Sequence, residues 1–205
     1  MTIFHWILLA GFVICLLSCL YHFFMALPAG KDIDYATPDA KTRQAVVYSF
    51  TKAMSPKKKE TAFMHLPTYT AGIFYHLGTF LSLFLVIFIF FNVSFPTWLA
   101  YSIIVFLAFT SICGLSILIK RMTSSLLKNL SNPDDYFSNI LVTGFQIITA
   151  IYLLLNTGLE YYFIITTILF LYLPIGKLRH TIYFFTARLH LGIFYGRRGT
   201  WPVKK

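Results

Sequence analysis

The feature that most constrains this chain is a series of five apolar segments, each about as long as a membrane-crossing helix. A helix needs about 20 residues to cross roughly 30 Å of hydrocarbon. Only 12% of the residues are charged, about half the share that is usual in a soluble domain. The sequence therefore predicts an all-α fold, an integral membrane bundle of five transmembrane helices over residues 3–27, 70–92, 97–119, 138–156 and 160–180.

The first segment is expected to be a retained span rather than a cleaved signal. It lacks a cationic start, is longer than the apolar core of a secretory signal, and no small-residue cleavage pattern follows it. We divide the chain into a transmembrane domain over 1–187 and a basic tail over 188–205. The three cysteines lie inside spans and form no CxxC pair, so neither a disulfide framework nor a zinc or iron–sulfur site is indicated.

The cations are distributed so unequally that they predict an orientation. All 17 Lys and Arg lie on the side of the long polar segments, whereas the side of the two short turns carries one charge, that of Glu160. By the positive-inside rule the N-terminus is outside and the C-terminus cytoplasmic. We therefore expect a multi-pass protein of the inner (cytoplasmic) membrane, in contact with anionic lipid. Nucleic acid is not expected as a partner, because the cations are split among three segments with no basic-aromatic module.

Two histidines are expected at one depth in the membrane. His76 lies 16 residues before the end of the second segment, about 24 Å down, and His180 lies 20 residues after the start of the fifth, about 30 Å down. A helix break at Pro174 and Gly176 would bring His180 back somewhat. Two imidazoles on different helices can supply both axial nitrogens of a haem iron. On spacing alone, interfacial histidines bonded to carbonyls or phosphates are an equal alternative.

The remaining histidines and the nearby cations give further candidates. His22 is a rival ligand, because it is expected at the same inner level, about 28 Å down the first span. His65 and His190 lie outside their spans and could pair around a second haem, and His5 is expected to be interfacial. Haem propionates would need cations at that boundary, and the sequence offers Lys177, Arg179, Lys120 and Arg121 there.

Three stretches carry a resemblance to a known family. "GIFYHLGTF" around His76, "LPIGKLR" before His180 and "YGRRGTWP" in the tail resemble the gamma subunit of respiratory nitrate reductase. They are also similar to membrane cytochromes of heterodisulfide reductase and sulfite-reduction complexes. The resemblance implies a haem b subunit that transfers electrons between a membrane quinone and a cytoplasmic iron–sulfur protein. That partner would be heterodisulfide reductase-like or nitrate reductase beta-like, and it would carry the terminal catalysis.

The resemblance also implies where haem would bind. His76 and His180 fall on the proximal ligand pair, whereas the distal pair falls on Val86 and Tyr162, neither of which is a normal haem b ligand. We therefore expect one haem b, with a second haem on His65 and His190 as the alternative.

Without a distal haem, quinone would approach the inner haem directly. Candidates for hydrogen bonds to its oxygens are Tyr75, His22, Lys177 and Arg179. The partner would dock on segments 28–69 and 188–205, with an exposed Trp201 as an anchor.

Two other classes of function were weighed. A haem-free membrane anchor for a cytoplasmic enzyme complex would keep the same fold. A small transporter is disfavoured, because the chain shows no internal repeat and the spans hold almost no ionisable residue apart from His22.

Overall fold

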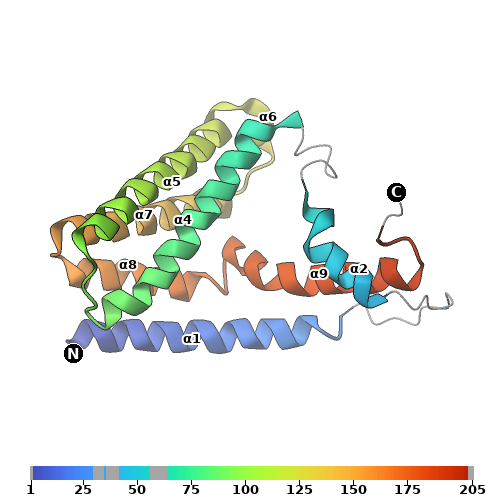
Figure 1. Ribbon diagram of the computed structural model, residues 1–205, viewed down its shortest axis with the longest axis horizontal. Coiled ribbons are helices and arrows are strands. Elements are labelled where there is room, and N and C mark those ends of the chain that lie inside the picture. The colour runs from blue at the N-terminus through green and yellow to red at the C-terminus, as the bar shows by residue number, and fades with distance from the viewer. Residues whose placement is uncertain (1, 30–34, 36–41, 56–63, 203–205) are drawn as a thin grey trace. The chain divides into compact units, whose positions relative to one another are not determined.

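The computed structural model describes residues 2–29, 35, 42–55 and 64–202, and every regular element within these ranges is a helix (Figure 1). The chain forms two compact units. Unit 1 comprises Met1–Cys15 and Pro67–Leu178, and unit 2 comprises Leu16–Leu66 and Arg179–Lys205.

Unit 1 holds most of the apolar helices. They are the first half of α1 (Ile3–Ala26), α4 (Leu66–Phe90), α5 (Thr97–Thr123), the short α6 (Ser125–Asn129), α7 (Pro133–Leu155) and α8 (Leu159–Tyr172). Helices α1, α4, α5 and α7 are each long and apolar enough to cross a membrane. The first four predicted spans are therefore confirmed as helices, with their ends moved by up to five residues.

The largest of these shifts has a local cause. Helix α7 begins at Pro133, five residues before the predicted span. Asn132 caps it: the Asn132 side chain accepts a hydrogen bond from the Asp135 backbone, and the Asp135 carboxylate accepts one from the Asn132 backbone. This reciprocal capping box satisfies N–H groups that would otherwise lack partners at a helix start.

The fifth predicted span is not one continuous helix. Helix α8 ends at Tyr172, and helical structure resumes with a short 3-10 turn, Lys177–Arg179, that leads into α9 (His180–Arg197). The break lies at Pro174 and Gly176 as expected, because proline cannot continue the hydrogen-bond ladder of a helix. Helix α8 has 14 residues, about 21 Å of rise. The described chain thus has four candidate spans, or five if α8 and the segment after the break form one.

The core of unit 1 joins α4, α5 and α7 through a buried amide. Gln146 on α7 donates from Nε2 to the Tyr75 carbonyl oxygen at 3.0 Å and to Thr79 Oγ1 at 2.8 Å, both on α4. Thr110 on α5 donates to Gln146 Oε1 at 2.8 Å. Gly78 gives α4 room beside this group, since a Cβ there would lie 2.1 Å from Thr110 Oγ1. Small residues and hydrogen bonds of this kind are what hold helices together in lipid.

Unit 2 is built around a pair of packed helices, α2 (Thr42–Phe50) and α9. Gly192 and Gly196 bring the two backbones together: a Cβ on Gly192 would lie 2.5 Å from Val46 Cα. The Ser49 hydroxyl donates to the Arg188 carbonyl oxygen at 2.6 Å. Segment 28–69, expected as a loop, therefore contains a packed helix. Helix α9 also runs without interruption across position 187, where the domain boundary was expected.

The end of the chain folds back onto this helix pair. The Trp201 ring lies 5.4 Å from that of Tyr48 and 4.6 Å from that of Tyr195, centroid to centroid. Trp201 is half-buried, so the expectation of an exposed anchor is wrong. The predicted basic run Lys57–Lys59 and the last residues of the tail lie outside the described residues.

Candidate functional site

The candidate site is a cavity of about 400 Å³ within unit 2. Its polar wall is formed by His22 from α1 and by Tyr183, Thr186 and His190 from α9. Ligand-binding pockets in proteins are commonly about 300–1,000 Å³. The cavity therefore has the size and the polar groups of a small-ligand site.

The spacing of these residues explains why they face one cavity. Tyr183, Thr186 and His190 are three and four residues apart, so they lie on one face of α9. The rest of the wall is apolar and mostly small: Met25, Ala26, Ala29 and Ala187. Small side chains in the wall leave room that larger residues would fill.

Tyr183 is a polar neighbour of His22 across the cavity wall. The Tyr183 hydroxyl lies 3.5 Å from His22 Nδ1, a long hydrogen bond, and the two rings are 6.2 Å apart. A partner at one ring nitrogen fixes the tautomer and orientation of a histidine and leaves the other nitrogen for a ligand. In His22 that nitrogen is Nε2.

The donor set of the cavity is too small for a bare metal ion. Within the described ranges, no group of three or more His, Cys, Asp or Glu could hold a metal, and a structural zinc site needs four protein ligands. A porphyrin iron needs only two axial ligands, because the macrocycle supplies the other four nitrogens. His22 and His190 supply two imidazoles from different helices, which is the number of ligands that this requirement sets.

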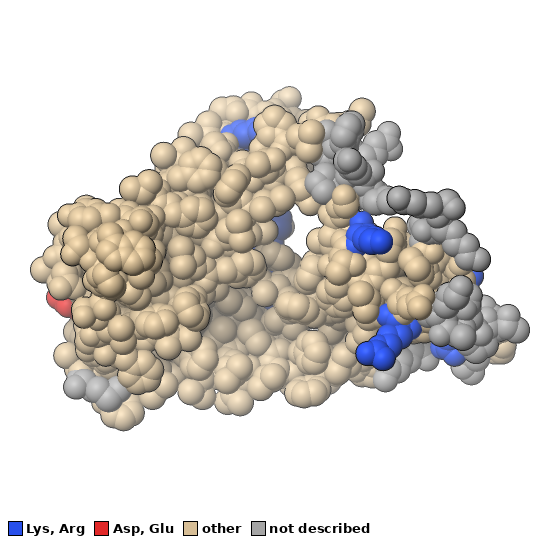
Figure 2. All heavy atoms as spheres, in the orientation of Figure 1, with Lys and Arg blue, Asp and Glu red and all other residues tan. Residues whose placement is uncertain are grey.

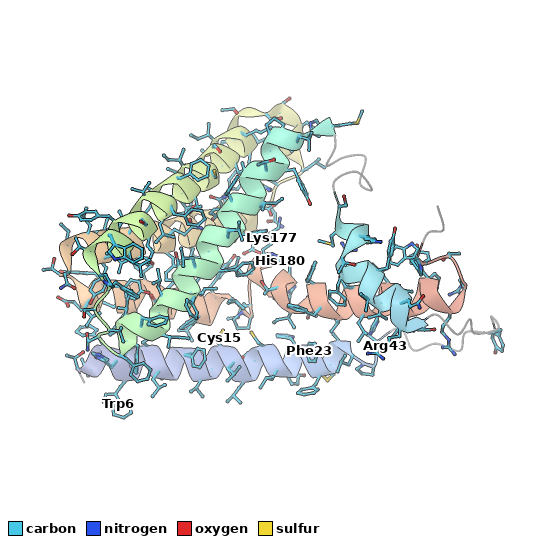
Figure 3. The ribbon with its side chains drawn as sticks, in the orientation of Figure 1. Trp6, Cys15, Phe23, Arg43, Lys177 and His180 are labelled. Atoms are coloured by element: carbon cyan, nitrogen blue, oxygen red, sulfur yellow. The ribbon has the colours of Figure 1, made fainter. Side chains whose placement is uncertain are left out.

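The predicted pair, His76 and His180, is divided between the two units. His76 lies exposed on α4 in unit 1, with its ring 6.4 Å from that of Phe80. His180 is the first residue of α9 in unit 2 and is also exposed (Figure 3). Both imidazoles are on the surface of their own unit, and their pairing stays a prediction.

Two of the propionate candidates have a protein counter-ion. Arg121 Nη1 lies 3.3 Å from Asp135 Oδ2, and Lys177 pairs with the same carboxylate. Asp135 is buried at the start of α7, so the two cations neutralise a charge that would be costly to bury alone. Arg179 is exposed and forms no salt bridge among the described residues.

Tyr75, predicted to bind quinone, is a packing residue. It is buried, and its hydroxyl donates to the Asn139 carbonyl oxygen at 3.1 Å and lies 3.0 Å from Thr143 Oγ1. Both partners are on α7, so the hydroxyl helps to join α4 to α7. His22, another quinone candidate, lies in the cavity of unit 2.

The positions expected for a distal haem are filled by packed side chains. Val86 and Tyr162 are both buried in unit 1, and Tyr162 has no exposed surface. Its ring stacks on those of Phe145 and Tyr152, with centroids 6.2 and 5.5 Å away.

The last two histidines have other surroundings than expected. His65 is exposed just before α4 and does not line the cavity, which His190 lines together with His22. His5 was expected at an interface but is buried against Phe90 and Phe163. Its Nδ1 accepts a hydrogen bond from the Thr2 backbone at 3.1 Å.

Sequence reasoning did not bring His22 and His190 to one cavity, because it placed His22 inside the first span and His190 outside the fifth, beside His65. The signal was present in the spacing of Tyr183, Thr186 and His190, which indicates one helix face. No family model matches the chain, and no curated protein or solved structure is significantly similar to it.

Proposed function

We propose that the chain is a haem b subunit that transfers electrons between a membrane quinone and a cytoplasmic iron–sulfur oxidoreductase subunit. The supporting observation is the cavity that His22 and His190 both line, which offers two imidazoles from different helices. Haem, when bound, supplies one-electron chemistry. Terminal catalysis would belong to the partner.

The residues of the cavity have distinct roles in this proposal. His22 and His190 would hold the haem iron, and the Tyr183 hydroxyl orients the His22 ring. Ala26, Ala29 and Ala187 are the small residues of the same cavity. His76 and His180 form the second candidate pair, which rests on the resemblance. One haem is expected, and a second would require both pairs to bind.

Quinone would approach from the lipid. Because the Tyr75 hydroxyl takes part in helix packing, Lys177 pairs with Asp135 and His22 is assigned to haem in this proposal, Arg179 is the residue to test for contact with quinone oxygens. Arg179→Gln should slow haem reduction by quinol without changing haem content.

The ligands are assigned by four single variants, His22→Ala, His190→Ala, His76→Ala and His180→Ala, each purified and examined by its reduced-minus-oxidised visible spectrum. Loss of the low-spin signal in the first two, with the signal kept in the last two, is expected. The reverse pattern would assign the ligands to His76 and His180 while leaving the function intact. If none of the four changes the spectrum, the bis-histidine proposal is wrong.

The partner is tested by co-purification of an iron–sulfur subunit with the wild-type chain and with the chain cut before Arg197. Recovery with the wild type and loss with the truncated chain would support docking on the tail. If neither chain recovers an iron–sulfur protein, the electron-transfer proposal loses its main support.

A haem-free membrane anchor is the second candidate function. It is favoured by the core of unit 1, in which the buried amide of Gln146 and the Tyr75 hydroxyl are satisfied by protein groups alone. An anchor would show no haem absorption and would still bind its partner.

A further inference from the structure

Helix α9 carries a row of aromatic, apolar and basic side chains that is exposed except at Arg188, which is half-buried. At the start of the row, the Phe184 ring lies 6.2 Å from that of Phe50 on α2, centroid to centroid. The residues recur at three- and four-residue spacing, which places them along one face. We call this row the aromatic–basic stripe: Phe184, Arg188, Leu191, Phe194 and Arg198. The opposite face of α9, which includes Gly192 and Gly196, is buried.

The stripe holds its cations against its aromatic rings. The Arg198 guanidinium lies 3.6 Å from the centroid of Phe194, and that of Arg188 lies 5.7 Å from the centroid of Phe184. Phe184, Leu191 and Phe194 are exposed despite being apolar. Arginine can lay its apolar stem along such side chains and keep its charged head in the headgroup layer, which is why Arg is favoured at membrane interfaces.

The charge of the chain is concentrated in the same unit. Unit 2 holds 13 of the 17 Lys and Arg but four of the seven Asp and Glu. In its described part there are six cations and no acidic residue: Arg43, Lys52, Arg179, Arg188, Arg197 and Arg198. Blue side chains gather over α2 and α9 in Figure 2. The positive charge of the described part of unit 2 is complementary to a negatively charged surface.

The stripe belongs to a packed structure and not to a free tail. Close approach of α2 at Gly192 and the hydrogen bond from Ser49 to the Arg188 carbonyl fix the position of α9 in its unit. Trp201 covers the end of the pair by packing on Tyr48 and Tyr195. A fixed stripe loses little conformational freedom when it binds.

We propose that the aromatic–basic stripe binds anionic phospholipid, with Arg188 and Arg198 pairing with headgroup phosphates and Phe184, Leu191 and Phe194 entering the acyl boundary. A lipid leaflet offers both parts of this match, phosphate and hydrocarbon, side by side. An acidic protein surface would match the cations but would leave the three apolar side chains without an equivalent partner.

Trp201 gives a local reporter for the test. The full chain with Trp6→Phe and Trp98→Phe keeps Trp201 as its one tryptophan, and it is placed in nanodiscs of phosphatidylcholine with phosphatidylglycerol. Bromine is carried on the acyl chains of one lipid or of the other. Quenching of Trp201 by brominated phosphatidylglycerol should exceed quenching by brominated phosphatidylcholine, and the preference should weaken in high salt.

Matched variants identify the residues responsible. Replacing Arg188 and Arg198 by Gln should reduce the preference, by about fivefold for each arginine removed. Arg188→Lys with Arg198→Lys should restore most of it, which separates loss of charge from loss of folding. Lys120→Gln with Lys128→Gln, which removes two cations of unit 1, should leave it unchanged.

Three outcomes would overturn the proposal. The first is equal quenching of the wild type by both brominated lipids. The second is a preference that survives removal of both arginines. The third is protection of Arg188 and Arg198 by an acidic protein partner while the two lipids quench equally.

Discussion

Gln146 is the residue through which three helices of unit 1 are joined. Its amide uses both its nitrogen and its oxygen, toward α4 and toward α5. Sequence reasoning did not single it out, because a lone glutamine in an apolar segment has no periodic signal. Its importance depends on Thr79 and Thr110, which are distant in sequence and reach it only after the helices pack.

Replacement of Gln146 by Leu should lower the free energy of unfolding in detergent by about 1–2 kcal/mol, the range found for interhelical hydrogen bonds in membranes. The loss arises because Thr79 and Thr110 then lack this interhelical partner. Denaturation by an anionic detergent, followed by circular dichroism, measures it. Ile147→Leu, at a partly exposed neighbouring position, is the control and should change little. If Gln146→Leu and the wild type had the same free energy of unfolding, the hydrogen bonds of Gln146 would not contribute to stability.

At the residue scale, the sequence indicated that the histidines are the residues of interest. It did not predict which side chains surround each of them in the fold. Depth estimates place a residue along the membrane normal and say nothing about the direction in which its side chain points. His5 illustrates this, since it was expected at an interface and is buried between two phenylalanines.

At the scale of the element, the four long spans were predictable because length and hydropathy alone determine them. The break at Pro174 and Gly176 was also predictable, since it follows from the covalent structure of proline. The packing of α2 on α9 was not, because Gly192 and Gly196 indicate a close approach only when the facing residues, Ala45 and Val46, are known.

Helix α4 offers a matched pair of glycines for testing close packing. A Cβ on Gly78 would lie 2.1 Å from Thr110 Oγ1, whereas one on Gly72 would have nothing within 4 Å. Gly78→Ala should therefore force α4 away from α5 and lower the free energy of unfolding by about 1–3 kcal/mol, the usual cost of overpacking. Gly72→Ala should be neutral or slightly stabilising. Similar thermal midpoints for the two variants would contradict the packing of α4 on α5.

At the scale of the whole molecule, the division of charge is the dominant feature. Unit 1, with four Lys and Arg and three Asp and Glu, is nearly neutral, whereas unit 2 is strongly basic. Composition predicted a basic membrane protein, and the structure adds that a folded helix pair carries part of this charge.

The proposed orientation is tested by labelling from one side of the membrane. In a background without native cysteines, Thr157→Cys should react with an impermeant maleimide added outside intact cells, because the turn after α7 is expected to be external. Lys128→Cys should react only after the membrane is opened. Reversed labelling would overturn the orientation and the cytoplasmic docking of the partner with it.

The haem content of the purified chain tests the proposed function most directly. The chain, expressed with an adequate supply of haem, is measured by the pyridine haemochrome assay and by its reduced-minus-oxidised spectrum. We predict about one low-spin haem b per chain, with two axial histidines. A spectrum without haem absorption, from a chain that is folded and inserted, would contradict the electron-transfer proposal and leave the membrane anchor in its place.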